Sequence, residues 1–219
     1  MNVALIVFAG LGTRINSSVP KQFIKINGKE MALYTIDAFQ NHPEIDEIIL
    51  VTHPNYYDFV KSLVEQYKLS KVKHIVKGGA TRQESVKLGL LETNYDDKDN
   101  VLIHDGDRPL VSKEIISENI RSLTRYSAVC TVIKHEDSLL EVSNLGRTKK
   151  INGEDIDVQT PQSFRYGIIK KYHVLKENEQ FSDDIGLIEN DYEVCYIKGD
   201  KYNFKVTTDI DLNYIEKLL

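Results

Sequence analysis

The chain has 219 residues, of which 41% are hydrophobic and 28% are charged, a balance typical of one globular domain with a sizeable core. Its formal net charge of −5 argues against a nucleic-acid partner, because phosphate backbones are bound by basic surfaces. No apolar run approaches the roughly 20 residues of a membrane helix, and no basic leader precedes the first apolar run. We therefore expect a cytoplasmic protein without a membrane partner, in which Cys130 and Cys195 are buried thiols.

Short apolar runs alternate with helix-like segments from the start of the chain. This βαβα alternation predicts an α/β fold with a doubly wound, mostly parallel sheet. Ligands bind to such sheets where the carboxyl ends of the strands meet the helix N-termini. The predicted strands are 3–8, 47–52, 74–76, 100–104 and 128–134, and the predicted helices are 33–39, 56–67, 82–91 and 113–126.

Residues 136–157 interrupt this alternation. They are polar, show no helical period and contain N-L-G and N-G, which are turn signals. We expect a β-arm inserted into a single domain that spans residues 1–219, either packed on a partner subunit or exposed as a hairpin. The rest of the chain predicts a helix at 166–179, strands at 193–198 and 203–206, and a closing helix at 209–219.

The first candidate loop, A-G-L-G-T-R, follows the first predicted strand and is followed by P-K-Q-F. Gly10 and Gly12 allow a tight turn that presents backbone N–H groups to an anion, and Arg14 and Lys21 add positive charge. The loop matches neither the G-x-G-x-x-G nor the G-x-x-x-x-G-K-[ST] pattern. Taken alone, it is either a phosphate-binding loop or an ordinary turn with surface cations.

The second and third candidate loops also follow predicted strands. In K-G-G-A-T-R-Q-E-S, the backbone amides are candidates to read a base or a phosphate, and Ser85 to bond a base nitrogen. In H-D-G-D-R-P, Asp105 suits Mg²⁺, which prefers oxygen ligands and bridges phosphates. The alternative is a structural ion pair between Asp105 and Arg108. We expect His104 to pack or to bond the backbone rather than to catalyse.

The last two candidate loops are Q-T-P-Q-S-F, at 159–164, and N-F-K-V-T-T, at 203–208. The first predicts a turn before a helix. The second places Lys205 on a strand, where it either neutralises charge on a phosphate or is a solvated surface lysine.

In this order, the five motifs make the sequence similar to the cytidylyltransferase family that includes 2-C-methyl-D-erythritol 4-phosphate and ribitol-5-phosphate cytidylyltransferases. The similarity runs from Val3 to about Leu212. It implies a nucleotide-diphospho-sugar transferase-like α/β fold, a homodimer formed through the β-arm, and a Mg²⁺ requirement. It also implies the reaction: CTP and a polyol phosphate give a CDP-polyol and pyrophosphate.

The resemblance also implies roles for individual residues. Arg14, Lys21 and Lys205 correspond to catalytic residues; Ala9, Gly10, Gly12, Gly79, Ser85 and Asp105 to nucleotide-binding residues; Ser138, Thr160, Ser182 and Arg108 to acceptor-binding residues; and Asp105 and Asp107 to metal ligands.

The chain departs from the family pattern at several positions. Asp107 is an extra carboxylate, Ala80 replaces an acidic residue, and Asn152 stands where the family has an arginine that grips the acceptor phosphate. The acceptor therefore stays open between methylerythritol phosphate and ribitol phosphate, which belong to isoprenoid and to teichoic-acid or capsule synthesis. The motifs also leave open a related nucleotidyltransferase with a different base or acceptor, and a non-catalytic nucleotide-binding protein.

Overall fold

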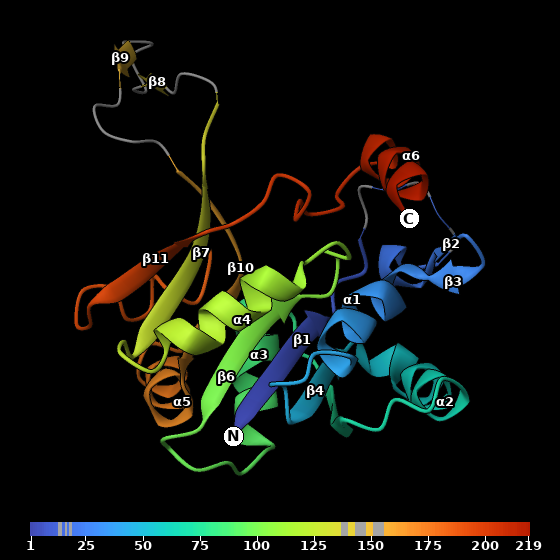
Figure 1. Cartoon of the computed structure of the whole chain (residues 1–219), viewed down its shortest axis with the longest axis horizontal. Helices are drawn as coiled ribbons and strands as arrows, with labels where there is room; N and C mark the ends of the chain where they lie inside the picture. Colours follow the sequence, from blue (N-terminus) through green and yellow to red (C-terminus); the bar gives the residue numbers. More distant parts are fainter. Residues whose placement is uncertain (13–14, 16, 18, 137–139, 143–147, 151–155) are drawn as a thin grey trace.

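The computed structural model describes residues 1–219 except 13–14, 16, 18, 137–139, 143–147 and 151–155. Its centre is a seven-stranded sheet with the strand order β11-β7-β10-β6-β1-β4-β5 (Figure 1). Strand β10 runs antiparallel to both of its neighbours, and the other pairs are parallel. The predicted doubly wound, mostly parallel α/β sheet is thus confirmed. The strands are β1 (Asn2–Phe8), β4 (Glu47–Thr52), β5 (Val72–Lys77), β6 (Asn100–Asp105), β7 (Ala128–Lys134), β10 (Ile156–Arg165) and β11 (Val194–Lys198).

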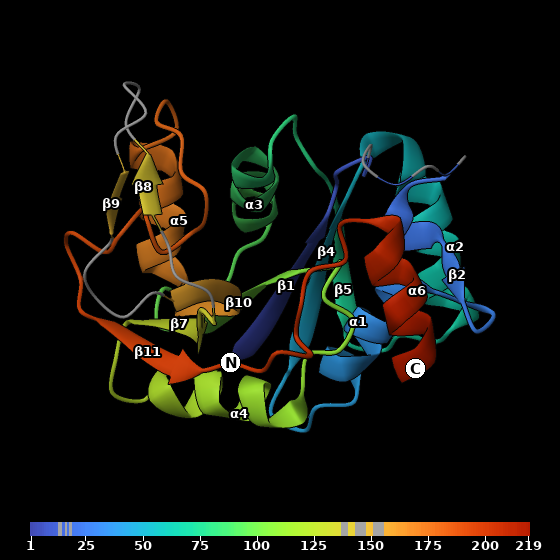
Figure 2. The ribbon, with the colours of Figure 1, turned by 90° about the horizontal axis from the view of Figure 1, so that it is seen from above.

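Helices cover both faces of the sheet (Figure 2). Helices α3 (Arg82–Leu91) and α5 (Tyr166–Leu175) pack on one face, and α1 (Met31–Gln40), α2 (Tyr57–Gln66) and α4 (Lys113–Ser122) pack on the other. Strand β1 shows why two cores form, because successive side chains of a strand point to opposite faces. Val3, Leu5 and Val7 belong to the α3–α5 core, whereas Ala4, Ile6 and Phe8 belong to the opposite core.

A capping box, formed by Thr208 and Asp211, begins the last helix, α6 (Asp209–Leu218). Two short 3₁₀ turns, at Lys21–Phe23 and Pro54–Tyr56, complete the helical segments. No helix in the described part of the chain is both long and apolar enough to cross a membrane. Of the two cysteines, Cys130 is buried as expected, but Cys195 is only partly buried.

Two local predictions are wrong. Residues 203–206 form no strand, so Lys205 lies on an irregular segment. Residues 159–164 are no turn before a helix: they lie inside β10, where the pairing with β7 shifts between Gln159 and Gln162. The Thr160–Pro161 peptide bond in this bulge is cis. The sequence analysis also missed the hairpin of β2 (Lys25–Ile26) and β3 (Lys29–Glu30), which turns at Asn27 and Gly28, both with positive φ.

Strands β8 (Leu140–Val142) and β9 (Thr148–Lys150) form a two-stranded antiparallel sheet within the predicted arm. Figure 1 shows this hairpin projecting beyond β7 and β10, away from the helices. Ser138 and Asn152 lie outside the described residues. The single-domain assignment and the contact of the arm with a partner subunit stay predictions.

Candidate active site

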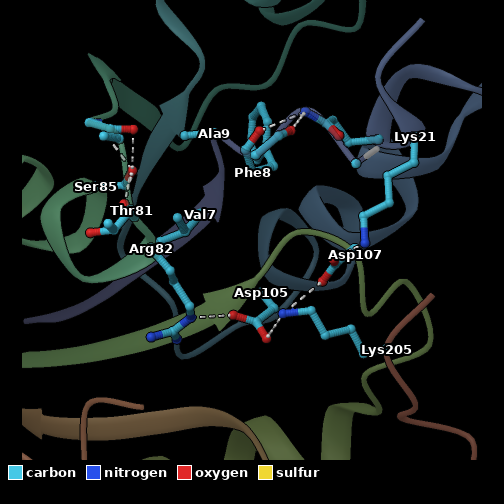
Figure 3. Close-up of a pocket in the computed structure, with 15 residues that line it drawn as sticks. Val7, Phe8, Ala9, Lys21, Thr81, Arg82, Ser85, Asp105, Asp107 and Lys205 are labelled. Atoms are coloured by element: carbon cyan, nitrogen blue, oxygen red, sulfur yellow. Dashed lines mark hydrogen bonds and ion pairs between the residues drawn. The ribbon is translucent and has the colours of Figure 1, made fainter. Parts of the chain in front are cut away.

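A pocket of about 290 Å³ opens where β1 and β6 end, beside the loop that follows β5 (Figure 3). These three strands are parallel, so their carboxyl ends meet at one edge of the sheet, where ligands of such folds bind. The irregular segment after β11 adds a lysine to the same pocket. The pocket is lined by Val7, Phe8, Ala9, Gly10, Gly12, Lys21, Gln22, Gly79, Ala80, Thr81, Arg82, Ser85, Asp105, Asp107 and Lys205.

The structure brings together most of the residues singled out by sequence. Nine of them line the pocket: Ala9, Gly10, Gly12, Lys21, Gly79, Ser85, Asp105, Asp107 and Lys205. Arg14 and Ser138 lie outside the described residues. Arg108, Thr160 and Ser182 do not line it. The individual roles of all these residues stay predictions.

The opening loop is shaped by the two residues of the P-K-Q-F motif that lie in the pocket. Gln22 donates from Nε2 to the carbonyl oxygens of Phe8 and Gly10, both at 2.8 Å, and so fixes the turn after β1. Gly12 has φ +67°, and a Cβ there would lie 2.8 Å from Cγ of Lys21. Glycine at this position therefore allows the stem of Lys21 to pass close to the loop.

The second loop holds itself in place with its own polar groups. The hydroxyl of Ser85 accepts from the Gly79 N–H at 3.1 Å and donates to the Thr81 carbonyl at 2.8 Å. The N–H of Ala80 donates to Oε2 of Glu84 at 2.8 Å. The amides of Gly79 and Ala80 are thus engaged within the protein in this structure, and the reading of a base or a phosphate by this loop stays a prediction. Ser85 lines the pocket, but its hydroxyl hydrogen already has a protein acceptor.

Asp105, at the end of β6, is the electrostatic centre of the site. Oδ1 accepts from Nε of Arg82 at 2.8 Å, and Oδ2 lies 3.0 Å from Nζ of Lys205 and 3.6 Å from Nε of Arg108. Burial alone would raise the pKa of this carboxyl, but the charges of Arg82, Lys205 and Arg108 together hold it well below its usual value. Asp105 is therefore a carboxylate at neutral pH, and the structural pair with Arg108 that the sequence left open does form.

Asp107 pairs with the other lysine of the pocket. Its Oδ2 lies 2.5 Å from Nζ of Lys21, and its Oδ1 lies 3.8 Å from Nζ of Lys205. Lys21 also donates to the carbonyl of Val206 at 2.6 Å. Lys205 thus lies between the two carboxylates, and Lys21 lies beyond Asp107 (Figure 3). Oδ1 of Asp107 is buried and has no hydrogen-bond partner among the described residues.

Behind the pocket, His104 and Thr160 form a buried chain of hydrogen bonds. Nε2 of His104 lies 3.2 Å from the carbonyl of Arg108, which can only accept, so we assign the ring hydrogen to Nε2. Nδ1 then accepts from the Thr160 hydroxyl at 3.0 Å, and that hydroxyl accepts from the Asp105 N–H at 3.1 Å. Burial lowers the pKa of His104 to about 3, so the ring is neutral. As expected, His104 has a structural role, and Thr160 shares it.

The two other predicted acceptor residues also lie outside the pocket lining. Arg108 is buried and donates from Nη1 to the Asn203 carbonyl at 2.8 Å, in addition to its pairing with Asp105. Ser182 is exposed, and its hydroxyl lies 3.5 Å from Oδ2 of Asp183. No described contact places Ser182 near the carboxylate cluster.

Sequence reasoning missed Arg82, the first residue of α3. Besides Asp105, it contacts Asp184, since Nη1 lies 2.8 Å from Oδ2 of that residue. Oδ1 of Asp184 lies 3.1 Å from Nε2 of His173, and the Asp184 N–H donates to Oε1 of Gln162 at 2.9 Å. The available signals were the arginine of G-G-x-x-R-x-x-S and the second aspartate of S-D-D, which are far apart in sequence.

The carboxylates of Asp105 and Asp107 suit a magnesium ion. Mg²⁺ is usually held by one or two carboxylates together with substrate phosphates and water. Oδ1 of Asp107, which is partnerless among the described residues, and Oδ2 of Asp105, both close to the Lys205 ammonium, are the carboxylate oxygens that would serve as such ligands. Among the described residues, no group of three or more aspartate, glutamate, histidine or cysteine side chains lies close enough together to hold a metal ion by itself. The donor set therefore fits an ion whose remaining ligands come from a bound nucleotide.

Comparison with known proteins identifies the family. The model of the IspD family, described as 2-C-methyl-D-erythritol 4-phosphate cytidylyltransferase, matches residues 2–219. Relatives with that name from Clostridium novyi (strain NT) and Clostridium botulinum (strain ATCC 19397 / Type A) are 38% and 39% identical, and the matches cover 100% of this chain and 96% and 97% of theirs. The crystal structure of 4-diphosphocytidyl-2C-methyl-D-erythritol synthase from Anaerococcus prevotii DSM 20548 matches with a TM-score of 0.87 and 29% identity, covering 99% of this chain and 95% of that one. The chain belongs to the 2-C-methyl-D-erythritol 4-phosphate cytidylyltransferase family.

Proposed function

We propose that this cytidylyltransferase transfers CMP from CTP to 2-C-methyl-D-erythritol 4-phosphate, giving the CDP-polyol and pyrophosphate. The family match along the whole chain supports the acceptor. The single structural observation that carries the reaction is the grouping of Lys21, Arg82 and Lys205 around two carboxylates in one glycine-lined pocket. Such a grouping can receive a triphosphate and neutralise charge on it.

The reaction is an in-line displacement at the α-phosphorus of CTP. An oxygen of the acceptor phosphate forms a bond to this phosphorus, and the bond to the bridging oxygen of pyrophosphate breaks. A phosphate monoester is already largely dianionic at neutral pH, since its second pKa is about 6. No strong general base is therefore needed, which agrees with a site whose buried histidine, His104, is engaged on both ring nitrogens.

Catalysis then depends on positioning and on charge. Lys21 and Lys205 come from segments far apart in the chain, and their ammonium groups lie beside the two carboxylate oxygens of Asp107. We propose that Lys21 binds the triphosphate and that Lys205 binds the α-phosphate. Negative charge on the α-phosphate increases while the bond to the acceptor oxygen forms and the bond to pyrophosphate breaks. The pairing of the two lysines with carboxylates keeps both ammonium groups inside the pocket before the nucleotide arrives.

We propose that Asp105 and Asp107 hold Mg²⁺ together with phosphate oxygens of CTP. The bound ion would withdraw charge from the α- and β-phosphates. With Asp105 and Asp107 holding the ion, the Lys205 ammonium would turn from the carboxylates toward the phosphates, and its side chain, which is 35% exposed, has room to do so.

We also propose that the enzyme is a homodimer formed beside the β-arm. The β11–β7–β10 end of the sheet, from which the arm projects, exposes apolar side chains on β10 and β11: Ile156 is 43% exposed, Val158 40% and Tyr196 53%. A second copy would bury these groups. Light scattering of the protein and of Tyr196→Glu tests this, because the charge should shift the variant toward monomer.

The test of function is pyrophosphate release in a matrix of substrates. The protein is incubated with Mg²⁺, with CTP, UTP, ATP or GTP, and with 2-C-methyl-D-erythritol 4-phosphate or ribitol 5-phosphate. We expect release that depends on acceptor and is largest with CTP and the methylerythritol phosphate. Larger release with ribitol 5-phosphate would contradict the proposed acceptor, and a preference for another nucleotide would contradict cytidylyl transfer by this pocket.

A further inference from the structure

Lys205 reaches the active site from a segment without helix or strand. Its side chain is 35% exposed, and its ammonium lies 3.0 Å from Oδ2 of Asp105. A lysine side chain has many rotamers and loses much of this freedom when it is fixed in place. Contacts of the side chain alone are therefore a weak means of placing the charge, and the backbone on either side must be held.

Asn203, two residues before Lys205, is fully buried. Its Nδ2 donates to the carbonyl of Thr160 at 2.8 Å and to Oε1 of Gln159 at 3.2 Å. Its own carbonyl accepts from Nη1 of Arg108 at 2.8 Å. One asparagine thus ties the segment to the bulge of β10 and to the loop that carries Asp105.

Gln159 completes this attachment. Its Nε2 donates to the carbonyl of Asp200 at 2.8 Å, and its Oε1 accepts from the Asp200 N–H at 3.3 Å. The side chain lies over Gly199, where a Cβ would be 2.4 Å from Oε1 of Gln159. A glycine at 199 is therefore required for this approach. Gln159 and Asn203 together replace the strand hydrogen bonds that the segment lacks.

The residue after Lys205 is attached independently. Val206 is buried, its N–H donates to the carbonyl of Asp107 at 2.9 Å, and its carbonyl accepts from Nζ of Lys21 at 2.6 Å. Lys205 therefore lies between two attachment points: Asn203 on the side of β10 and Val206 on the side of the active-site loop.

We propose that Asn203 is a positioning residue for Lys205. It does not line the pocket, and it acts by fixing the backbone from which the lysine reaches the reacting phosphate. This inference rests on the proposed function. The relevant group is the amide N–H₂, because Oδ1 of Asn203 has no hydrogen-bond partner among the described residues.

The test compares Asn203→Asp and Asn203→Ala with wild type. The aspartate keeps the shape but sets an oxygen against two acceptor oxygens, so both variants should lose about 10- to 100-fold in kcat, as expected for a displaced catalytic group, with a smaller change in the KM for CTP. Tyr202→Ala, which truncates an exposed neighbour, is the matched control and should keep wild-type activity. Thermal unfolding confirms that each variant is folded at the assay temperature.

A double-mutant cycle with Lys205→Ala separates positioning from general damage. If Asn203 acts through Lys205, adding Asn203→Ala to Lys205→Ala should change kcat by no more than about twofold. Losses that multiply, or an Asn203→Asp variant with wild-type kcat, would overturn the inference. If Asn203→Ala does not fold, Gln159→Ala enters the same cycle with the same expectation. Wild-type activity in the same series tests the proposed function separately.

Discussion

Arg82 donates from Nη1 to Oδ2 of Asp184 at 2.8 Å, and Asp184 is only 1% exposed. The other edge of the same guanidinium donates from Nε to Asp105. Arg82 therefore links the active-site carboxylate to a buried carboxylate that His173 holds from behind. Arg82, the first residue of α3, is thus held between two carboxylates. Because Arg82 lines the pocket, these ion pairs also fix that part of the pocket wall.

Removing the charge of Asp184 should destabilise the protein. Asp184→Asn leaves Arg82 with one carboxylate partner, and we expect the free energy of unfolding to fall by on the order of 2 kcal/mol. This is less than for a fully buried pair, because Arg82 is partly exposed and keeps Asp105. Urea unfolding at pH 7 measures the change. The exposed Glu193→Gln serves as control, and an equal loss in both variants would refute the argument.

Lys21 should be essential for turnover but not for folding. Lys21→Ala removes a charge that we assign to the triphosphate, and kcat should fall by about 10²–10³-fold. Lys25→Ala removes a lysine whose side chain is 64% exposed, four residues along the chain, and should be nearly silent. Steady-state kinetics and circular dichroism of both variants check this. Turnover near wild type in Lys21→Ala would count against the assigned site.

Asp107 should determine the magnesium dependence that we propose. Asp107→Asn removes a proposed ligand, so the Mg²⁺ concentration for half-maximal rate should rise by about tenfold or more. Binding of Mn²⁺ to the enzyme–CTP complex, followed by electron paramagnetic resonance, gives a second readout. Asp58→Asn, at an exposed site on α2, controls for net charge. Unchanged metal dependence would show that Asp107 does not bind the ion and that it only pairs with Lys21.

The stability of the protein should fall below pH 6.5 because of His104. Burial lowers the pKa of this imidazole from 6.5 to about 3, so between these values the unfolded chain binds a proton that the folded protein does not. Unfolding free energy should then decrease as pH falls, by up to about 1.4 kcal/mol per pH unit.

The buried carboxylates affect the free energy of unfolding in a different pH range. The pKa values of Asp105 and Asp184 lie below the usual 3.8, so their stabilisation is present above that pH and is lost only as pH falls further. Urea unfolding from pH 8 to 4 therefore reports the buried histidines, His104 and also His42, whose pKa burial lowers as well. His104→Gln should flatten the slope, although it lowers stability at pH 8, and a wild-type slope in that variant would contradict the assignment.

The strands of the sheet and the helices that cover it were predictable, because the spacing of their apolar residues follows which side chains are buried. Strand 47–52 and helix 82–91 appear with the predicted bounds. The segment around Lys205 was not predictable in the same way. Its N-x-K-V-T pattern looks like a strand, but its polar groups bond instead to the Gln159 side chain and the Thr160 carbonyl of β10 and to the Arg108 side chain.

The site shows the same limit. Glycines and charges at strand ends located the pocket, since parallel strands end at one edge. The sequence did not show that Arg82 meets Asp184, because the two residues are brought together only by the packing of α3 against the segment after α5. Nor did it show that Thr160 and Arg108 direct their polar groups toward the protein rather than the pocket.

Cytidylyl transfer by this pocket is tested most directly by following the phosphorus chemistry of the wild-type enzyme. A ³¹P spectrum is recorded over time with CTP, Mg²⁺ and 2-C-methyl-D-erythritol 4-phosphate. We predict that the signals of a new diphosphate diester and of pyrophosphate grow in equal amounts, and that neither grows without the acceptor. Pyrophosphate or orthophosphate released from CTP alone, or unchanged CTP with the acceptor present, would contradict this prediction.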